Sequence, residues 1–170
     1  MEIKKVETAN GKEVRVGIAD LNMALPPDKI ITVGLGSCIG IALYDNFKKV
    51  GGLVHIMLPD STQFAKVTNP LKFADLGIPI LIDKMKTKGA NPARLKAKIA
   101  GGASMFNFPD KSMTMDIGRR NGIAVKQILQ KLSIPLISED IGGNKGRTMI
   151  LDSETGKVFI KTVGIGAKEI

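Results

Sequence analysis

Three apolar runs follow one another in residues 29–58, which read KIITVGLGSCIGIALYDNFKKVGGLVHIML. The runs at 29–35, 38–44 and 50–58 are rich in Ile, Leu and Val, a composition typical of strands. The polar link at 45–49 has the length of a hairpin connection, so we expect the second and third runs to pair antiparallel. Glycines at 34 and 36 predict a turn between the first and second runs.

The rest of the chain adds strands and two principal helices. Alternating apolar residues predict strands at 13–20, 95–100, 134–141, 147–152 and 157–163, with a loop at 26–28 and a turn at 153–156. Helical spacing predicts one helix that has Pro79 near its first turn and ends at Gly89, and another that runs from an Asp116 N-cap through Leu132. Residues 61–71 are polar and irregular, which predicts a surface loop. No linker or repeat divides residues 1–170, so we expect one strand-rich α+β domain.

Composition excludes several classes of protein. The 170 residues carry 25 Lys and Arg against 16 Asp and Glu, a formal charge of +9, with one Cys and one His. These last two counts exclude a disulfide framework and the usual zinc sites, predict no metal, and favour a reducing, cytoplasmic location. No apolar run approaches the ~20 residues of a membrane span. The positive charge suggests an acidic partner, but scattered basic residues and few aromatic ones argue against nucleic acid.

The single cysteine and the single histidine fall on the predicted hairpin. Considered alone, Cys38 is more often a small buried hydrophobe, and His55 is more often a hydrogen-bonded core residue. The hairpin register, however, places Cys38 opposite residues 55–57, within reach of His55. An imidazole there would lower the pKa of the thiol and move protons during nucleophilic catalysis. The group that orients the imidazole remains open at this point, and the candidates by proximity are Thr32, Ser37, Asp60 and Ser61.

Glycine-rich turns supply further candidates. Main-chain N–H groups around Gly36 and Ser37 could form an oxyanion hole beside the thiol. Ser104 follows Gly101-Gly102 and Asn144 follows Gly142-Gly143, so either side chain could contact a substrate. For most of these glycines, tight turns and close packing are the favoured interpretation. The stretch 119–121, Arg-Arg-Asn, could cap neighbouring loops or meet an acidic substrate.

Five ordered motifs carry a family resemblance: TVGLGSC at 32–38, VHIMLPDS at 54–61, KIAGGASMF at 98–106, IGRRN at 117–121 and EDIGGNKGR at 139–147. Together they resemble the chemoreceptor glutamine deamidases of the CheD family over nearly the whole chain. The resemblance implies a cytoplasmic chemotaxis enzyme that converts receptor glutamines to glutamates and releases ammonia. It also implies a three-layer α/β/β sandwich with mixed sheets, similar to the catalytic domain of cytotoxic necrotizing factors, with no cofactor and with the phosphatase CheC as a partner.

The same resemblance assigns roles to residues. Cys38 matches the family's nucleophile, His55 its histidine and Thr32 the threonine that completes the triad. The chain departs from the family pattern in longer segments at 61–71 and 107–114 and in Phe73, where the family often has Tyr, which bears on the substrate groove and partner surface. Two other functions stay open: a non-catalytic regulatory partner of CheC, and a basic nucleic-acid-binding domain.

Overall fold

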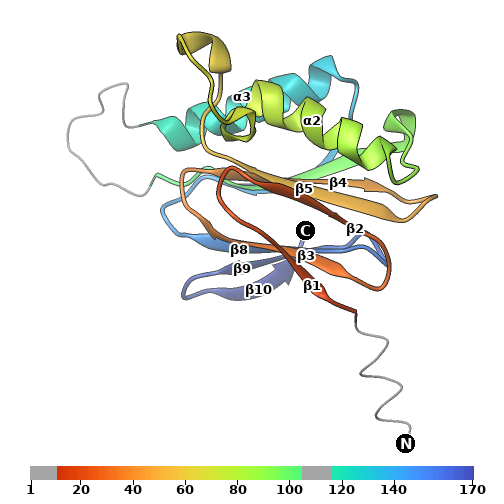
Figure 1. The fold of residues 1–170 in the computed structure, drawn as a ribbon. Helices are drawn as coiled ribbons and strands as arrows, with labels where there is room; N and C mark the ends of the chain where they lie inside the picture. Colours follow the sequence, from red (N-terminus) through yellow and green to blue (C-terminus); the bar gives the residue numbers. More distant parts are fainter. Residues whose placement is uncertain (1–10, 105–115) are drawn as a thin grey trace, which may run out of the picture.

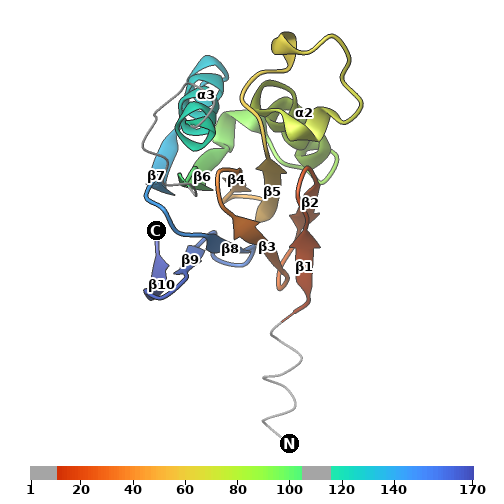
Figure 2. The same cartoon turned by 90° about the vertical axis from the view of Figure 1, so that its left-hand side faces the viewer.

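Two sheets and two helices stack in three layers (Figure 1). The structure is a computed structural model and describes residues 11–104 and 116–170. One sheet has the strand order β1-β3-β8-β9-β10 and the other β2-β5-β4-β6-β7. The helices α2 and α3 cover one face of the second sheet, and the first sheet packs on its other face (Figure 2). The expected three-layer α/β/β sandwich is confirmed.

Both sheets are mixed. The first contains β1 (Glu13–Val16), β3 (Lys29–Leu35), β8 (Arg147–Asp152), β9 (Val158–Thr162) and β10 (Gly166–Glu169). The second contains β2 (Leu21–Ala24), β5 (Val50–Ile56), β4 (Ile39–Asp45), β6 (Lys96–Gly101) and β7 (Leu136–Ile141). The pairs β1–β3 and β6–β7 are parallel and the others are antiparallel.

The predicted hairpin of β4 and β5 is confirmed and forms the centre of the molecule. Both strands are buried along their whole length, because one face meets the helices and the other meets the first sheet. Successive side chains of a strand point to opposite faces. Ile41 and Val54 therefore pack toward the helices, whereas Ala42 and Leu53 pack into the core between the sheets. Residue 55, two positions after Leu53, belongs to the same inter-sheet face.

The predicted strand at 13–20 is wrong in its second half. The chain leaves β1 after Val16 and turns at Ala19, which has a left-handed φ of 56°. Its N–H donates to the carbonyl of His55 at 2.9 Å, and β2 then pairs with β5. The short strands β2 and β10 were not predicted. The other predicted strands are found, with ends that differ by up to two residues.

The helices also differ from expectation in detail. Helix α2 spans Ala74–Lys86, so Pro79 lies inside it and not near its first turn. The proline gives up one main-chain hydrogen bond, at a cost of about 3 kcal/mol, while a buried stripe that includes Ile78, Leu81 and Met85 packs against the second sheet. Helix α3 spans Ile117–Lys131 as expected, but Asp116 makes no side-chain capping bond.

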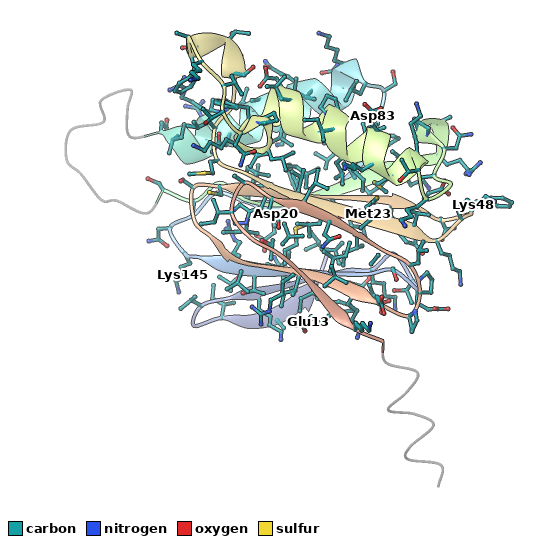
Figure 3. The ribbon with its side chains drawn as sticks, viewed as in Figure 1. Glu13, Asp20, Met23, Lys48, Asp83 and Lys145 are labelled. Carbon is teal, nitrogen blue, oxygen red and sulfur yellow. The ribbon has the colours of Figure 1, made fainter. Side chains whose placement is uncertain are left out.

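The segment predicted as the surface loop 61–71 contains the 3₁₀ turn η1 (Ser61–Gln63) and the start of a second, η2 (Pro70–Lys72). A third, η3 (Pro92–Arg94), precedes β6. The tip of the β4–β5 hairpin, with Lys48, lies at the opposite end of the sandwich from Lys145 (Figure 3). None of the described helices is long and apolar enough to cross a bilayer.

Candidate active site

Thr32 and His55 meet between the two sheets. Thr32 is on β3 of the first sheet and His55 is on β5 of the second, and both are fully buried. The distance from Thr32 Oγ1 to His55 Nδ1 is 2.7 Å, and that from Thr32 Oγ1 to the Val16 carbonyl is 2.8 Å. Of the four candidate orienting groups, Thr32 is therefore the one hydrogen-bonded to the ring. Ser61 bonds Asp75 at 2.6 Å, and Asp60 accepts from Thr62.

These two hydrogen bonds fix the tautomer of His55. A carbonyl oxygen can only accept, so the single hydroxyl proton of Thr32 is donated to Val16. The hydroxyl oxygen must then accept from the ring, which places the imidazole proton on Nδ1. Nε2 is left with a lone pair, and this buried atom has no hydrogen-bond partner in the described part of the chain. The geometry thus presents a neutral imidazole with Nε2 ready to act as a base.

Cys38 lies on the same face of the second sheet as His55. In the β4–β5 ladder Gly40 pairs with His55 and Ile39 with Ile56, so the position opposite Cys38 is Met57. The Cys38 side chain packs against the inter-sheet core, where His55 also points. Residues diagonal to one another on one face of an antiparallel pair lie within reach of long or aromatic side chains. Cys38 and His55 stand in this diagonal relation.

Burial keeps the thiol and the imidazole neutral. Desolvation raises the pKa of the Cys38 thiol, and its own main-chain N–H acts in the opposite direction. Desolvation lowers the pKa of His55 to about 4. Burial therefore favours the neutral form of each group, and the expected lowering of the thiol pKa by His55 is not seen. A neutral pair can still react if Nε2 accepts the thiol proton while sulfur attacks.

Two main-chain N–H groups next to Cys38 could stabilise an oxyanion. Gly34 has a φ of +78°, and the N–H of Gly36 donates to its carbonyl at 3.1 Å. That bond occupies the Gly36 donor, which had been expected in the oxyanion hole. Within residues 11–104 and 116–170, no other residue accepts a hydrogen bond from the N–H groups of Ser37 and Cys38. These two groups are the better candidates.

Glycine turns pack against the strand end that carries Cys38. The N–H of Gly102 donates to the Cys38 carbonyl at 2.8 Å, and a side chain at Gly101, whose φ is +117°, would collide with that carbonyl. The guanidinium of the buried Arg147 donates to the carbonyls of Gly101 at 2.7 Å and Gly142 at 2.6 Å. Close packing therefore accounts for Gly101 and Gly102.

The two predicted substrate-contacting residues lie near these turns. Ser104 lines a hollow of about 380 Å³ between α3 and the ends of β6 and β7. Its N–H donates to the carbonyl of Gly143 at 2.9 Å. Asn144 is exposed and is not among the residues lining this hollow. The motif residues Met105 and Phe106, and the segment 107–114, lie outside the described residues.

Asn121 connects helix α3 to both strands of the site. Its fully buried Nδ2 donates to the carbonyls of Ser37 and Met57, both at 2.9 Å. Of the two interpretations left open for 119–121, capping of neighbouring loops is the one that Asn121 fulfils. In the described residues, no group of three or more His, Cys, Asp or Glu is placed to hold a metal ion.

Comparison with known proteins identifies the family. Residues 57–162 match the family model described as CheD chemotactic sensory transduction. A protein of Clostridium botulinum (strain Hall), named probable chemoreceptor glutamine deamidase CheD, is 75% identical over 159 residues, which are 94% of this chain and 98% of that protein. The chain belongs to the CheD family. A Clostridium acetobutylicum CheD with the same name is 69% identical over 164 residues, covering 96% of this chain and 99% of that protein.

A solved structure, the Bacillus licheniformis hypothetical protein YfiH, aligns with this CheD chain at a TM-score of 0.38 and 17% identity. The aligned part covers 66% of this chain and 46% of the YfiH chain. Capping by one of the residues 119–121 was an open interpretation of the sequence, but Asn121 was not singled out, although a signal for it was present. Asn121 lies four residues from both Ile117 and Val125, so it interrupts the apolar stripe of α3 with a polar side chain.

Proposed function

We propose that this CheD protein deamidates glutamine side chains of chemoreceptors, with Cys38 as nucleophile, His55 as general base and acid, and Thr32 as the group that orients the imidazole. The observation that carries the proposal is the Thr32–His55 hydrogen bond of 2.7 Å, which leaves Nε2 unprotonated on the face shared with Cys38. The names of the Clostridium relatives support the substrate class.

In the first half of the reaction, Nε2 of His55 accepts the thiol proton while Cys38 Sγ attacks the side-chain amide carbon of glutamine. The amide oxygen becomes an oxyanion, which the main-chain N–H groups of Ser37 and Cys38 stabilise. The imidazolium then gives its proton to the amide nitrogen. The carbon–nitrogen bond breaks, ammonia leaves, and a thioester joins the substrate to Cys38.

In the second half, Nε2 takes a proton from water and the resulting hydroxide attacks the thioester carbon. When the carbon–sulfur bond breaks, the imidazolium returns its proton to the sulfur. The products are the original thiol and a glutamic acid side chain, which loses its proton to solvent and becomes glutamate, so water is the only co-reactant and no cofactor is needed. Throughout, the bond from Nδ1–H to Thr32 Oγ1 keeps the ring in one orientation and stabilises its charged form.

The experiment that tests the proposal uses a purified chemoreceptor cytoplasmic domain. Ammonia release and conversion of glutamine to glutamate, read by mass spectrometry, are measured for the wild type, Cys38→Ala and Cys38→Ser. We expect both variants to unfold at the wild-type temperature and to lose deamidation. Deamidation that persists in Cys38→Ala would overturn the assignment of the nucleophile.

The resemblance also leads us to propose a cytoplasmic reaction and a CheC-type phosphatase as a partner. Binding to such a phosphatase, measured together with receptor deamidation, separates the enzyme from the non-catalytic regulator. If the chain binds the phosphatase and the wild type does not deamidate receptors, the protein is a non-catalytic regulator. Receptor deamidation that depends on Cys38 excludes that alternative.

A further inference from the structure

Asn121 reaches the site because helix α3 approaches the glycine turn unusually closely. A side chain at Gly118, one turn earlier, would come within 2.5 Å of the Ala103 carbonyl oxygen and 2.7 Å of Gly102 main-chain atoms. The absence of that side chain lets the helix settle against the strand ends. The amide of Asn121 then extends between the end of β5 and the segment that leads into β4.

Both N–H bonds of the Asn121 side-chain amide donate to main-chain carbonyls. One belongs to Ser37, which directly precedes Cys38, and the other to Met57, two residues after His55. A neutral side chain with two donors on one nitrogen suits two carbonyl acceptors, and an amide is such a group. Asn121 therefore ties together the two strand ends that carry the thiol and the imidazole.

The bond to Ser37 also fixes the next N–H group. In a planar trans peptide the C=O and N–H bonds point in opposite directions. Because the Ser37 carbonyl points to Asn121, the N–H of Cys38 points away from the helix. This N–H lowers the pKa of the Cys38 thiol against the opposing effect of burial, as a donor to the sulfur would. Donation to the carbonyl also polarises the peptide, which strengthens its N–H as a donor.

The cost of keeping an amide here supports a specific role. Oδ1 of Asn121 is buried and has no hydrogen-bond partner in the described ranges. A buried acceptor without a partner is destabilising, but an apolar residue at this position would instead leave the carbonyls of Ser37 and Met57 without this donor. The donors of the amide, and not its contribution to packing, account for its presence.

We propose that Asn121 is a positioning residue, which holds the Ser37–Cys38 peptide with its N–H directed at the reacting thiol and at the oxyanion formed there. This inference rests on the proposed function, because it assigns the N–H a task in the deamidation. Its effect on the thiol can be measured without a substrate.

The test compares wild type, Asn121→Ala and the matched control Gln127→Ala, which changes an exposed residue farther along the same helix. Cys38 is the only cysteine, so alkylation by iodoacetamide counts the sites and reports thiol reactivity against pH, while circular dichroism checks that each variant is folded. In Asn121→Ala we expect the pH midpoint of alkylation to rise by about one unit. We expect kcat per titrated site to fall about tenfold or more, with KM within about twofold.

The control Gln127→Ala should match the wild type in both measurements. If Asn121→Ala does not fold, Asn121→Ser leaves a smaller void and one donor, and the same changes are expected at smaller size. An alkylation midpoint that does not move overturns the inference, as does a kcat per site within twofold of wild type. If the wild type does not deamidate receptors, the proposed function fails, and the alkylation midpoint alone then decides the inference.

Discussion

Replacing Thr32 with valine removes one hydroxyl from the boundary between the two sheets and keeps the shape of the side chain. In the wild type this hydroxyl accepts from His55 Nδ1 and donates to Val16. In Thr32→Val the Nδ1–H has no acceptor at that position. Nothing then favours the proton on Nδ1, so the ring also populates the tautomer protonated on Nε2, which is the wrong one for a base that must accept a proton from Cys38.

The structure sets the size of both effects. One buried donor left without a partner costs about 1–3 kcal/mol, so the free energy of unfolding should fall by that amount. General base catalysis contributes about 10²–10⁴ to a rate, so kcat should fall about a hundredfold or more when Nε2 carries the proton. KM should change little, because the hydroxyl lies inside the fold.

The assay measures receptor deamidation and urea unfolding for the wild type, Thr32→Val and Thr32→Ser. Serine keeps the hydroxyl and deletes a methyl group, so it separates the hydrogen bond from packing. We expect Thr32→Ser to retain kcat within a few fold. If Thr32→Val and Thr32→Ser have the same kcat, or if the valine variant matches the wild type, the orienting role of Thr32 is refuted.

Three further predictions concern stability and local geometry. Burial lowers the pKa of His55 to about 4, below its ordinary 6.5, so between these values the unfolded chain binds a proton that the folded chain does not. The free energy of unfolding should therefore be full above pH 6.5 and lower by about 2 kcal/mol at pH 5. Urea titrations of His55→Gln should lack this difference. Burial acts to raise the pKa of Asp45, but Arg94 and main-chain N–H groups lower it to about 2. Asp45→Asn should therefore destabilise the fold by about 1–3 kcal/mol in thermal unfolding at pH 7, and an unchanged melting temperature would contradict this role. Gly101→Ala should abolish deamidation, since the methyl group would collide with the Cys38 carbonyl; activity near that of wild type would show that the strand end tolerates displacement.

The centre of the fold was predictable because its signals are local. Strands β3, β4 and β5 were predicted to within two residues, since long Ile- and Val-rich runs are bounded by glycine or polar turns. Strand β10 was missed because its residues are all exposed and show no alternation. Helix α2 runs through Pro79 because tertiary burial of its apolar stripe outweighs a local propensity.

The site was only partly predictable for the same reason. The hairpin register places Cys38 and His55 diagonally on one face of the sheet, and a register can be counted along the sequence. The choice of Thr32 over Asp60 as the bonded group rested on resemblance, because it depends on how the first sheet packs on the second. The depressed pKa of His55 depends on the completeness of its burial, which no local pattern reports.

The Thr32–His55 bond crosses the boundary between the layers, and this has a consequence for the variation that the core can accept. Gly40, the ladder partner of His55, faces Met149 and Leu35, whose atoms would lie 2.9 Å and 3.2 Å from any added Cβ. A bulkier residue at any of these positions would push the sheets apart. The Thr32–His55 hydrogen bond would lengthen before the protein unfolded. Substitutions in this part of the interior should therefore be selected for turnover as strictly as for stability, although none of them touches the substrate.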